Sequence, residues 1–210
     1  MSFRIAVVAS VSIMSGCTDS AQSSGIRAAV EVVIADDALR ASASIYDGSA
    51  PYVISPSEHL TVGVHDQTID LTYGENNTIY FGRPYFGTGA LAQPVAGDEP
   101  VTLTLERAED SRSFAGTAPA ELVLEAPATV ATGADLVITW SPSSSDPMRW
   151  YAGSDQGTID DGAGTMTFPY DVITTWGTPG STVELELQRL RVTGGVTVRR
   201  IATAEIMVTQ

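Results

Sequence analysis

The sequence predicts an all-β protein in which two antiparallel β-sandwiches follow an export signal and a short tether. Apolar and polar residues alternate in one run after another from residue 26 onward, as in strands with one buried and one exposed face. Clusters of Gly, Asn, Asp and Pro separate these runs at intervals of about ten residues, which is typical of sandwiches. No window gives a convincing helix, because the best candidate, residues 121–126, is short and flanked by prolines.

Residues 1–16 have the composition of a secretory signal. Arg4 is their only charged residue, residues 5–14 are predominantly apolar, and two small residues follow. At about 1.5 Å per residue, the apolar run reaches only half way across a hydrocarbon core of about 30 Å. We therefore expect a signal that is cleaved and not a membrane-spanning helix.

Cys17, the only cysteine of the chain, directly follows this signal. The stretch Ile13-Met14-Ser15-Gly16-Cys17 resembles the lipobox of bacterial lipoproteins, with methionine where leucine is usual. The resemblance implies cleavage before Cys17, acylation of this cysteine with a fatty acid such as palmitate, and attachment to the cell envelope through lipid alone. Thr18, where an aspartate would favour the inner membrane, points by the same resemblance to the outer membrane.

The composition of the mature chain limits its partners. Residues 17–25 are small and polar, which predicts a flexible tether behind the acylated cysteine. The chain from Cys17 onward would contain 25 acidic residues and ten arginines, with no lysine, for a net charge of −15. This charge disfavours nucleic acid and anionic lipid as partners. It fits solubility in a crowded envelope, with cation binding as the second interpretation.

Residues 26–118 are predicted to form the first β-sandwich. Alternation marks its strands at residues 30–34, 39–45, 60–64, 69–73 and 101–105. Turn sequences such as Asp47-Gly48 separate them. A domain boundary is expected near residues 119–127, because a small, proline-containing segment there precedes a new series of strands.

Residues 119–210 are predicted to form the second sandwich, with strands at residues 136–140, 148–152, 165–169, 183–192 and 196–208. Gly194-Gly195 predicts a tight hairpin between the last two strands, because glycine adopts positive φ without steric cost. In this hairpin Val183, Leu185 and Leu187 should point inward, and Glu184, Glu186 and Gln188 outward.

The run Leu136-Val137-Ile138-Thr139-Trp140-Ser141-Pro142, followed by Tyr151, resembles the second-to-third strand region of fibronectin type III and related immunoglobulin-like modules. In such modules a tryptophan on an inner strand fills the core between the sheets. The resemblance implies an immunoglobulin-like sandwich for the second region. The first region gives a looser impression of the same class.

Asp155, Asp160 and Asp161 lie in a glycine-rich segment and are the candidate metal ligands, for Ca²⁺. The segment lacks the spacing of an EF-hand loop, and aspartates that bond to their own turns are the alternative interpretation. His59 and His65 would be about 20 Å apart on an extended strand, too far to share one ion. No other cofactor is expected.

Aromatic residues are the candidate contact surface for a sugar or a partner protein. Tyr80, Phe81, Tyr85 and Phe86 fall within seven residues, and Trp176 lies in a predicted loop. Exposed rings of this kind stack on sugars or anchor protein interfaces. The more ordinary interpretation is that they fill the ends of the sandwich cores or the seam between the domains.

No motif for catalysis is present. The sequence has no Gly-x-Ser-x-Gly elbow, its single thiol is assigned to acylation, and nothing distinguishes one pair of carboxylates from the others. We therefore expect a non-enzymatic, lipid-anchored envelope protein that acts as a binding or structural module. The alternative is a carbohydrate- or calcium-binding accessory protein of an adhesion or export system.

Overall fold

The computed structural model describes residues 25–35, 38–73, 85–108 and 110–210. In these residues the strands form three sheets, and the helical segments are one 3-10 turn, η1 (Asp161–Ala163), and one α-helix, α1 (Tyr170–Trp176). The all-β prediction is therefore confirmed. Cys17, Tyr80 and Phe81 lie outside the described residues. Within the described ranges, no helix is long and apolar enough to cross a membrane.

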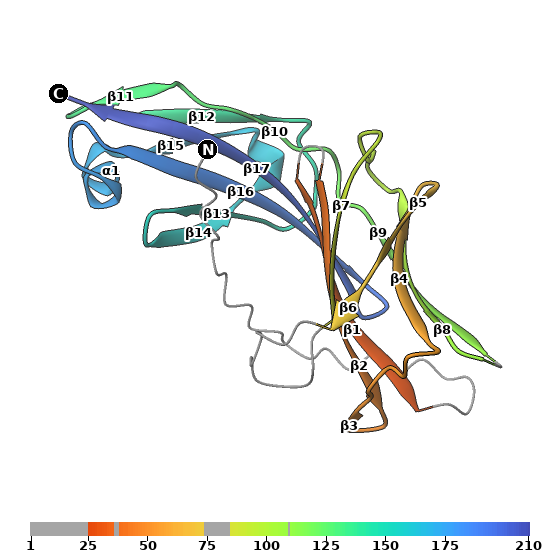
Figure 1. The fold of residues 1–210 in the computed structure, drawn as a ribbon. Coiled ribbons are helices and arrows are strands. Elements are labelled where there is room, and N and C mark those ends of the chain that lie inside the picture. Colours follow the sequence, from red (N-terminus) through yellow and green to blue (C-terminus); the bar gives the residue numbers. More distant parts are fainter. Residues whose placement is uncertain (1–24, 36–37, 74–84, 109) are drawn as a thin grey trace.

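The strands of the first sandwich are β1 (Ile26–Ala35), β2 (Ala38–Asp47), β3 (Ala50–Pro51), β4 (His59–Val64), β5 (Gln67–Asp70), β6 (Thr72–Tyr73), β7 (Tyr85–Ala90), β8 (Pro100–Glu106) and β9 (Ser111–Thr117). One sheet has the order β1-β2-β7-β6, and it packs on a second sheet of order β5-β4-β8-β9 (Figure 1).

The predicted inward faces of the first sandwich are buried in the structure. These core residues are Val30, Val32, Ile34, Leu39, Ala41, Ala43, Ile45, Leu60, Val62, Val64, Val101, Leu103 and Leu105. Tyr73 is the exception, since it is 45% exposed. The chain crosses from one sheet to the other at the buried Leu71, so Tyr73 lies on the short edge strand β6 and not on the core face.

The strands of the second sandwich are β10 (Val123–Glu125), β11 (Thr129–Ala131), β12 (Leu136–Ser141), β13 (Met148–Ala152), β14 (Asp155–Ile159), β15 (Thr165–Phe168), β16 (Thr182–Thr193) and β17 (Val196–Thr209). One sheet has the order β10-β12-β15, and the other β14-β13-β16-β17 with β11 beside β17. The chain thus crosses between the sheets as in an immunoglobulin-like sandwich. Leu136, Ile138 and Trp140 share the buried face of β12, as predicted.

The long strand β17 belongs to both sandwiches, so a single ten-stranded sheet runs through the molecule (Figure 1). Residues 196–201 of β17 pair in parallel with residues 30–35 of β1. Val196 and Val198 are buried in the first core, whereas Ile206 and Val208 of the same strand are buried in the second. The domain bounds 26–118 and 119–210 stay a prediction, and this pairing adds a strand from the later region to the first sandwich.

Glycines allow the edges of the first sandwich to close. A Cβ atom on Gly87 of β7 would lie 2.4 Å from the carbonyl oxygen of Asp70. A Cβ atom on Gly116 of β9 would lie 2.8 Å from Cγ1 of Val196. Both distances are too short for any side chain, so glycine is what permits β7 to approach β5 and β9 to approach β17.

The predicted hairpin between β16 and β17 is confirmed. Gly194 and Gly195 form a two-residue turn with φ of 56° and 84°, as in a type I′ turn. Val183, Leu185 and Leu187 are buried, as predicted. Gln188, however, is only 1% exposed.

Gln188 has neighbours on both sides that account for its burial. It pairs with Arg149 and Ile201 in the sheet. Its side chain accepts a hydrogen bond from Nη1 of Arg199 at 3.1 Å and donates one to Glu186. Alternation alone does not reveal such cover by long neighbouring side chains.

The helix α1 corrects the expectation that no helix would form, and it ends at Trp176, which the sequence places in a loop. Seven residues are too few to produce a helical periodicity, and a helix of this length is marginal by itself. The N–H group of Tyr170 donates to Oδ1 of Asp135 at 3.1 Å, so its cap comes from 35 residues earlier in the chain. Burial of Ile173 fixes the helix on the second core.

Candidate functional site

Asp155 and Asp160, two of the three predicted calcium ligands, have separate partners. Asp160 accepts a hydrogen bond from the N–H of Gly162 at 3.1 Å and so caps η1. Asp155 accepts hydrogen bonds from Oγ1 of Thr175 at 2.7 Å and from Nε1 of Trp176 at 3.1 Å. Asp160 therefore stabilises the start of η1, and Asp155 joins β14 to the end of α1.

Asp161, the third predicted ligand, is buried and paired with Arg189 at 2.5 Å. Among the described residues, no group of three or more His, Cys, Asp or Glu side chains could hold a metal ion. His59 is exposed at the start of β4, while His65 lies past its end, with Nε2 at 2.6 Å from Oε2 of Glu99. The structure does not bring these candidates together, and calcium binding stays a prediction.

The predicted aromatic residues that the structure describes belong to two different cores. Tyr85 is 4% exposed in the first core, and Phe86 beside it is half-buried. Trp176 packs in the second core, with its ring centroid 5.7 Å from Trp150 and 4.8 Å from Phe168. Tyr85 and Trp176 thus do not form one exposed patch, and these rings mainly fill the cores.

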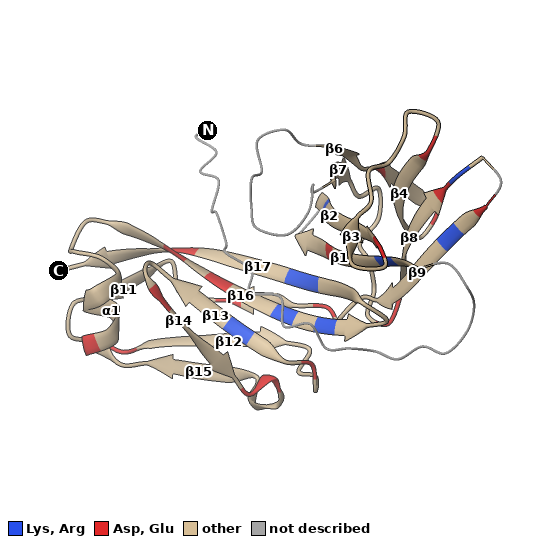
Figure 2. Cartoon of the chain, turned by 90° about the horizontal axis from the view of Figure 1, so that it is seen from below, with Lys and Arg blue, Asp and Glu red and all other residues tan. Residues whose placement is uncertain are grey.

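The main polar cluster was not predicted from the sequence, and it lies where the long sheet passes from one sandwich to the other. Arg189 and Arg200 are cross-strand neighbours on the inward face of β16 and β17, and Arg191 lies two residues further along β16. Figure 2 shows the basic segments of β16 and β17 side by side at this level. We call these three arginines and their partners the arginine junction. One feature of the sequence indicates this cluster. Arg189 is charged, although it occupies the next inward-facing position of the strand after Val183, Leu185 and Leu187.

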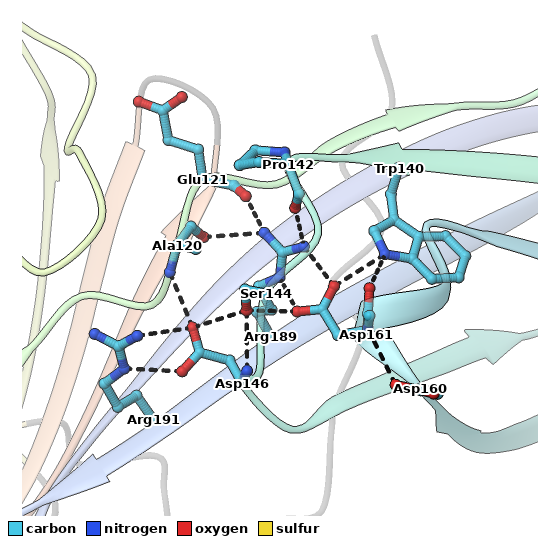
Figure 3. A network of polar contacts seen from close by, with 11 residues as sticks. Ala120, Glu121, Trp140, Pro142, Ser144, Asp146, Asp160, Asp161, Arg189 and Arg191 are labelled. Carbon is cyan, nitrogen blue, oxygen red and sulfur yellow. Dashed lines mark hydrogen bonds and ion pairs between the residues drawn. The ribbon is translucent and has the colours of Figure 1, made fainter.

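Arg189 is completely buried, and its guanidinium is fully engaged (Figure 3). Its Nε and Nη2 each donate to one carboxylate oxygen of Asp161 at 2.5 Å, a bidentate pair. Nη1 donates to the carbonyl oxygens of Ala120 and Glu121, and Nη2 also donates to that of Pro142. A buried charge of this kind is tolerated only when it is paired and hydrogen-bonded.

Asp161 is held from other directions as well. Its carboxylate accepts hydrogen bonds from Nε1 of Trp140 at 2.9 Å and from Oγ of Ser144 at 2.7 Å. The tryptophan of β12, which was predicted to fill the core, therefore also orients the partner of Arg189. The arrangement leaves this carboxylate fully occupied.

Arg191 forms a second bidentate pair, with both oxygens of Asp146 at 2.9 Å. Its Nη1 donates to the carbonyl oxygen of Ala118 at 3.0 Å and to the exposed carboxylate of Asp98. Burial acts to raise the pKa of Asp146, but hydrogen bonds from Arg191 and from the N–H of Ala120 outweigh it and hold this pKa below its usual value. The same hydrogen bonds to Asp146 raise the pKa of Arg191.

Arg200 is buried like Arg189, whereas the side chain of Arg191 is 25% exposed. Its Nη2 donates to the carbonyl oxygens of Val95 at 2.6 Å, Pro119 at 3.2 Å and Ala96 at 3.3 Å. Burial lowers its pKa. Its Nε has no hydrogen-bond partner within the described part of the chain.

Together the three guanidinium groups bind the segment that connects the sandwiches. The carbonyl oxygens of four consecutive residues, 118–121, accept hydrogen bonds from Arg191, Arg200 and Arg189. The N–H of Ala120 donates to Asp146 at 3.1 Å. The carboxylates of Asp98, Asp146 and Asp161 in the junction are each paired with an arginine. The chemistry of the junction is that of a clamp on the connecting segment.

Two hollows of the described surface lie away from the junction. One is lined by Ala38, Leu39, Arg40, Thr88, Gly89 and Ala90, and the other by Glu58, Arg107, Ala108 and Asp110. In the second, Glu58 already accepts hydrogen bonds from Tyr52 and from the N–H of Ser55. Neither hollow gathers the groups of a catalytic site.

No protein-family model matches the sequence, and no curated protein matches it in sequence. Among solved structures, the chain is similar to the full ectodomain (Ig1–Ig3) of mouse nectin-like molecule 4, with 12% identity, 88% of this chain and 65% of that chain covered, and a TM-score of 0.31. It is also similar to a tandem pair of titin immunoglobulin domains, with 14% identity, 89% and 96% of the two chains covered, and a TM-score of 0.28. The chain thus spans just under two thirds of the nectin-like chain. At these TM-scores the immunoglobulin-like assignment rests on the strand order and not on the neighbours.

Proposed function

We propose that the protein is a non-enzymatic structural module of the bacterial cell envelope, anchored by lipid at Cys17, which acts as a stiff spacer. The observation that carries this proposal is the arginine junction. Connections between domains normally allow relative motion. Here the buried guanidinium groups of Arg189 and Arg200, together with the partly buried one of Arg191, hold four consecutive carbonyl groups of the connecting segment. Bending at this segment would remove buried charges from their partners, which is costly.

The direction of the strands supports a spacer of defined length. Strand β1 runs parallel to β17, so its first residue, Ile26, lies at the end of the first sandwich remote from the second. Thr209 ends β17 at the opposite end of the molecule (Figure 1). Ten residues of β1 and eight further residues of β17 separate these ends, or about 60 Å at about 3.3 Å per residue. The tether at residues 17–25 would attach this rod to the lipid.

The anchoring half of the proposal is tested by mass spectrometry of the N-terminus and by membrane fractionation. We expect an acylated Cys17 and a membrane-bound protein, with release of the Cys17→Ser variant into the soluble fraction. A soluble wild-type protein with a free thiol would contradict the lipid anchor and leave the spacer half unaffected.

The spacer half is tested by the distance between two spin labels. In the Cys17→Ser background, cysteines replace the exposed Ser111 of the first sandwich and Ser154 of the second. We expect one narrow distance distribution, which broadens when Arg189→Met removes the bonds of the clamp to residues 120 and 121. Arg112→Gln is the matched control, because Arg112 forms an exposed pair with Asp110. A broad distribution in the parent protein would show a flexible connection and refute the spacer.

A further inference from the structure

The first sandwich is incomplete without strands from the later part of the chain. Residues 196–201 of β17 are the only described neighbours of β1 on the side away from β2. Val196 and Val198 are fully buried in the first core. Without β17, residues 30–35 would form an open strand edge, and the first core would lose Val196 and Val198. Such a long, apolar edge strand favours aggregation.

The approach of β9 to β17 supports the same dependence. Gly116 lies against Val196 so closely that no side chain fits between them. Strand β9, which contains Gly116, lies beside both β16 and β17 without pairing to either. The later hairpin therefore closes one whole side of the first sandwich, which residues 26–117 leave open.

The second sandwich has no comparable need for the first. Its buried core residues all come from residues 122–208, and its sheets contain strands β10 to β17. The partners of Arg189 are Asp161, the carbonyl group of residue 142, and those of residues 120 and 121 in the connecting segment, and none of them lies in the first sandwich. Two arginines bind residues of the first region, Arg200 through Val95 and Ala96 and Arg191 through Asp98 and Ala118. If the first sandwich opened, Arg191 would keep its pair with Asp146, and the guanidinium of Arg200 would become accessible to water.

We propose that the folded second sandwich is the template on which the first sandwich closes, so that the chain folds in the reverse of its order of synthesis. The hairpin presents the edge of β17, and β1 adds to it by parallel pairing. Parallel pairing between strands some 160 residues apart in sequence has a high entropic cost unless one partner is already ordered. The first sandwich consequently stays open until residues 182–209 are available, a state suited to passage of an unfolded chain across a membrane.

The proposal predicts a one-way dependence, which matched core variants of the full chain test. Leu185 of the second core and Leu103 of the first are both fully buried leucines on strands. All three tryptophans, Trp140, Trp150 and Trp176, lie in the second sandwich, so their fluorescence reports on it alone. Hydrogen exchange of the amides of β4 and β8 reports on the first sandwich.

Leu185→Ala should lower the urea midpoint of tryptophan fluorescence and, by the same shift, the urea concentration at which β4 and β8 lose protection. Leu103→Ala should lower only the urea concentration at which β4 and β8 lose protection and should leave the fluorescence midpoint unchanged. Protection of β4 and β8 that survives after the second sandwich has unfolded in Leu185→Ala would overturn the proposal. Equal shifts of both signals in Leu103→Ala would also overturn it, because the dependence would then be mutual.

The wild-type chain gives a second test in case a variant fails to fold. During refolding from urea, pulse labelling should protect the amides of β13 and β16 before those of β4 and β8. Earlier or simultaneous protection of β4 and β8 would refute the template order.

Discussion

Arg189 occupies a position where the alternation of β16 predicts an apolar side chain. It has two carboxylate bonds and carbonyl acceptors from the connecting segment, all in a completely buried site. A buried ion pair adds little net stability compared with a well-packed apolar pair, but removing one partner strands the other charge. We therefore expect the pair to specify how the connecting segment docks more than it stabilises the fold.

Arg189→Met should reduce the free energy of unfolding by about 3–5 kcal/mol, because Asp161 is left as an uncompensated buried charge. The double variant Arg189→Met with Asp161→Asn should lose clearly less than the single variant, since the stranded charge is gone. Urea titrations followed by tryptophan fluorescence measure both. Arg112→Gln, at an exposed pair, should change stability by about 1 kcal/mol or less. Equal losses in the single and double variants would show that the charge of Asp161 does not matter.

Asp146 gives the junction a pH dependence of defined sign. Its pKa in the folded state is below its usual value, so its contribution is present above the unfolded pKa of about 3.9 and disappears as pH falls through the folded pKa. Asp146→Asn should cost about 2 kcal/mol at pH 7. The difference from wild type should shrink steadily below pH 4. Unfolding curves at pH 7 and at successively lower pH check this, and a difference that is constant with pH would contradict the role of the charge.

Glu186 should behave in the opposite way. Burial raises its pKa in the folded state, and the neighbouring Glu184 acts in the same direction. A carboxyl group with a raised pKa destabilises the folded state at neutral pH, and this cost is relieved as pH falls toward the unfolded pKa. Glu186→Gln should therefore raise the urea midpoint at pH 7 and have less effect near pH 4. A midpoint that drops at pH 7 would instead indicate that the hydrogen bond between Glu186 and Gln188 dominates.

At the scale of elements, the closing of the first sandwich depends on small residues at strand edges. Gly116→Ala should destabilise the protein by about 1–3 kcal/mol, because the added Cβ meets Val196 at 2.8 Å. Gly63→Ala is the matched control in β4 of the same sheet, where the nearest atom to an added Cβ lies at 3.8 Å. It should be neutral or slightly stabilising. Melting curves of the two variants compare them directly, and equal effects would show that the contact with β17 is not tight.

The elements that periodicity predicts are the long strands with one buried face, such as β2, β8 and β12. Strands of two or three residues, such as β3, β6 and β11, contain too few positions to show alternation. Helix α1 depends on a cap from Asp135, a contact that no local pattern reveals. Periodicity also states which face of a strand is buried but not which strand lies beside it, so the pairing of β1 with β17 was not predictable.

The candidate site was less predictable than the fold for a related reason. Asp155, Asp160 and Asp161 lie close together in the sequence and were therefore predicted to act as one group. In the structure each carboxylate has a different partner: Trp176, the N–H of Gly162 and Arg189, respectively. What the sequence does not contain is the distance between Asp161 and Arg189, which lie 28 residues apart. The only local sign of a buried ion pair is a charged residue at an inward-facing position of a strand, as Arg189 is in this sequence.

At the scale of the whole molecule, the acidic surface and the buried arginines respond differently to salt. The chain carries a net charge of −14, so repulsion among surface carboxylates opposes the compact state. Salt screens such exposed charges within a Debye length of about 10 Å at 0.1 M, whereas buried pairs are screened much less. Raising NaCl from 10 to about 200 mM, across the range in which that length falls steeply, should therefore stabilise the protein.

The salt dependence of the unfolding free energy also separates the two contributions. Arg189→Met should be less stable than wild type at every salt concentration but should show a similar slope, because the pair that it lacks is buried. Urea titrations at several NaCl concentrations measure the slopes for both proteins. If salt destabilised the wild type and this effect vanished in Arg189→Met, the junction would have to be exposed to ions. That result would contradict the buried clamp on which the proposed spacer function rests.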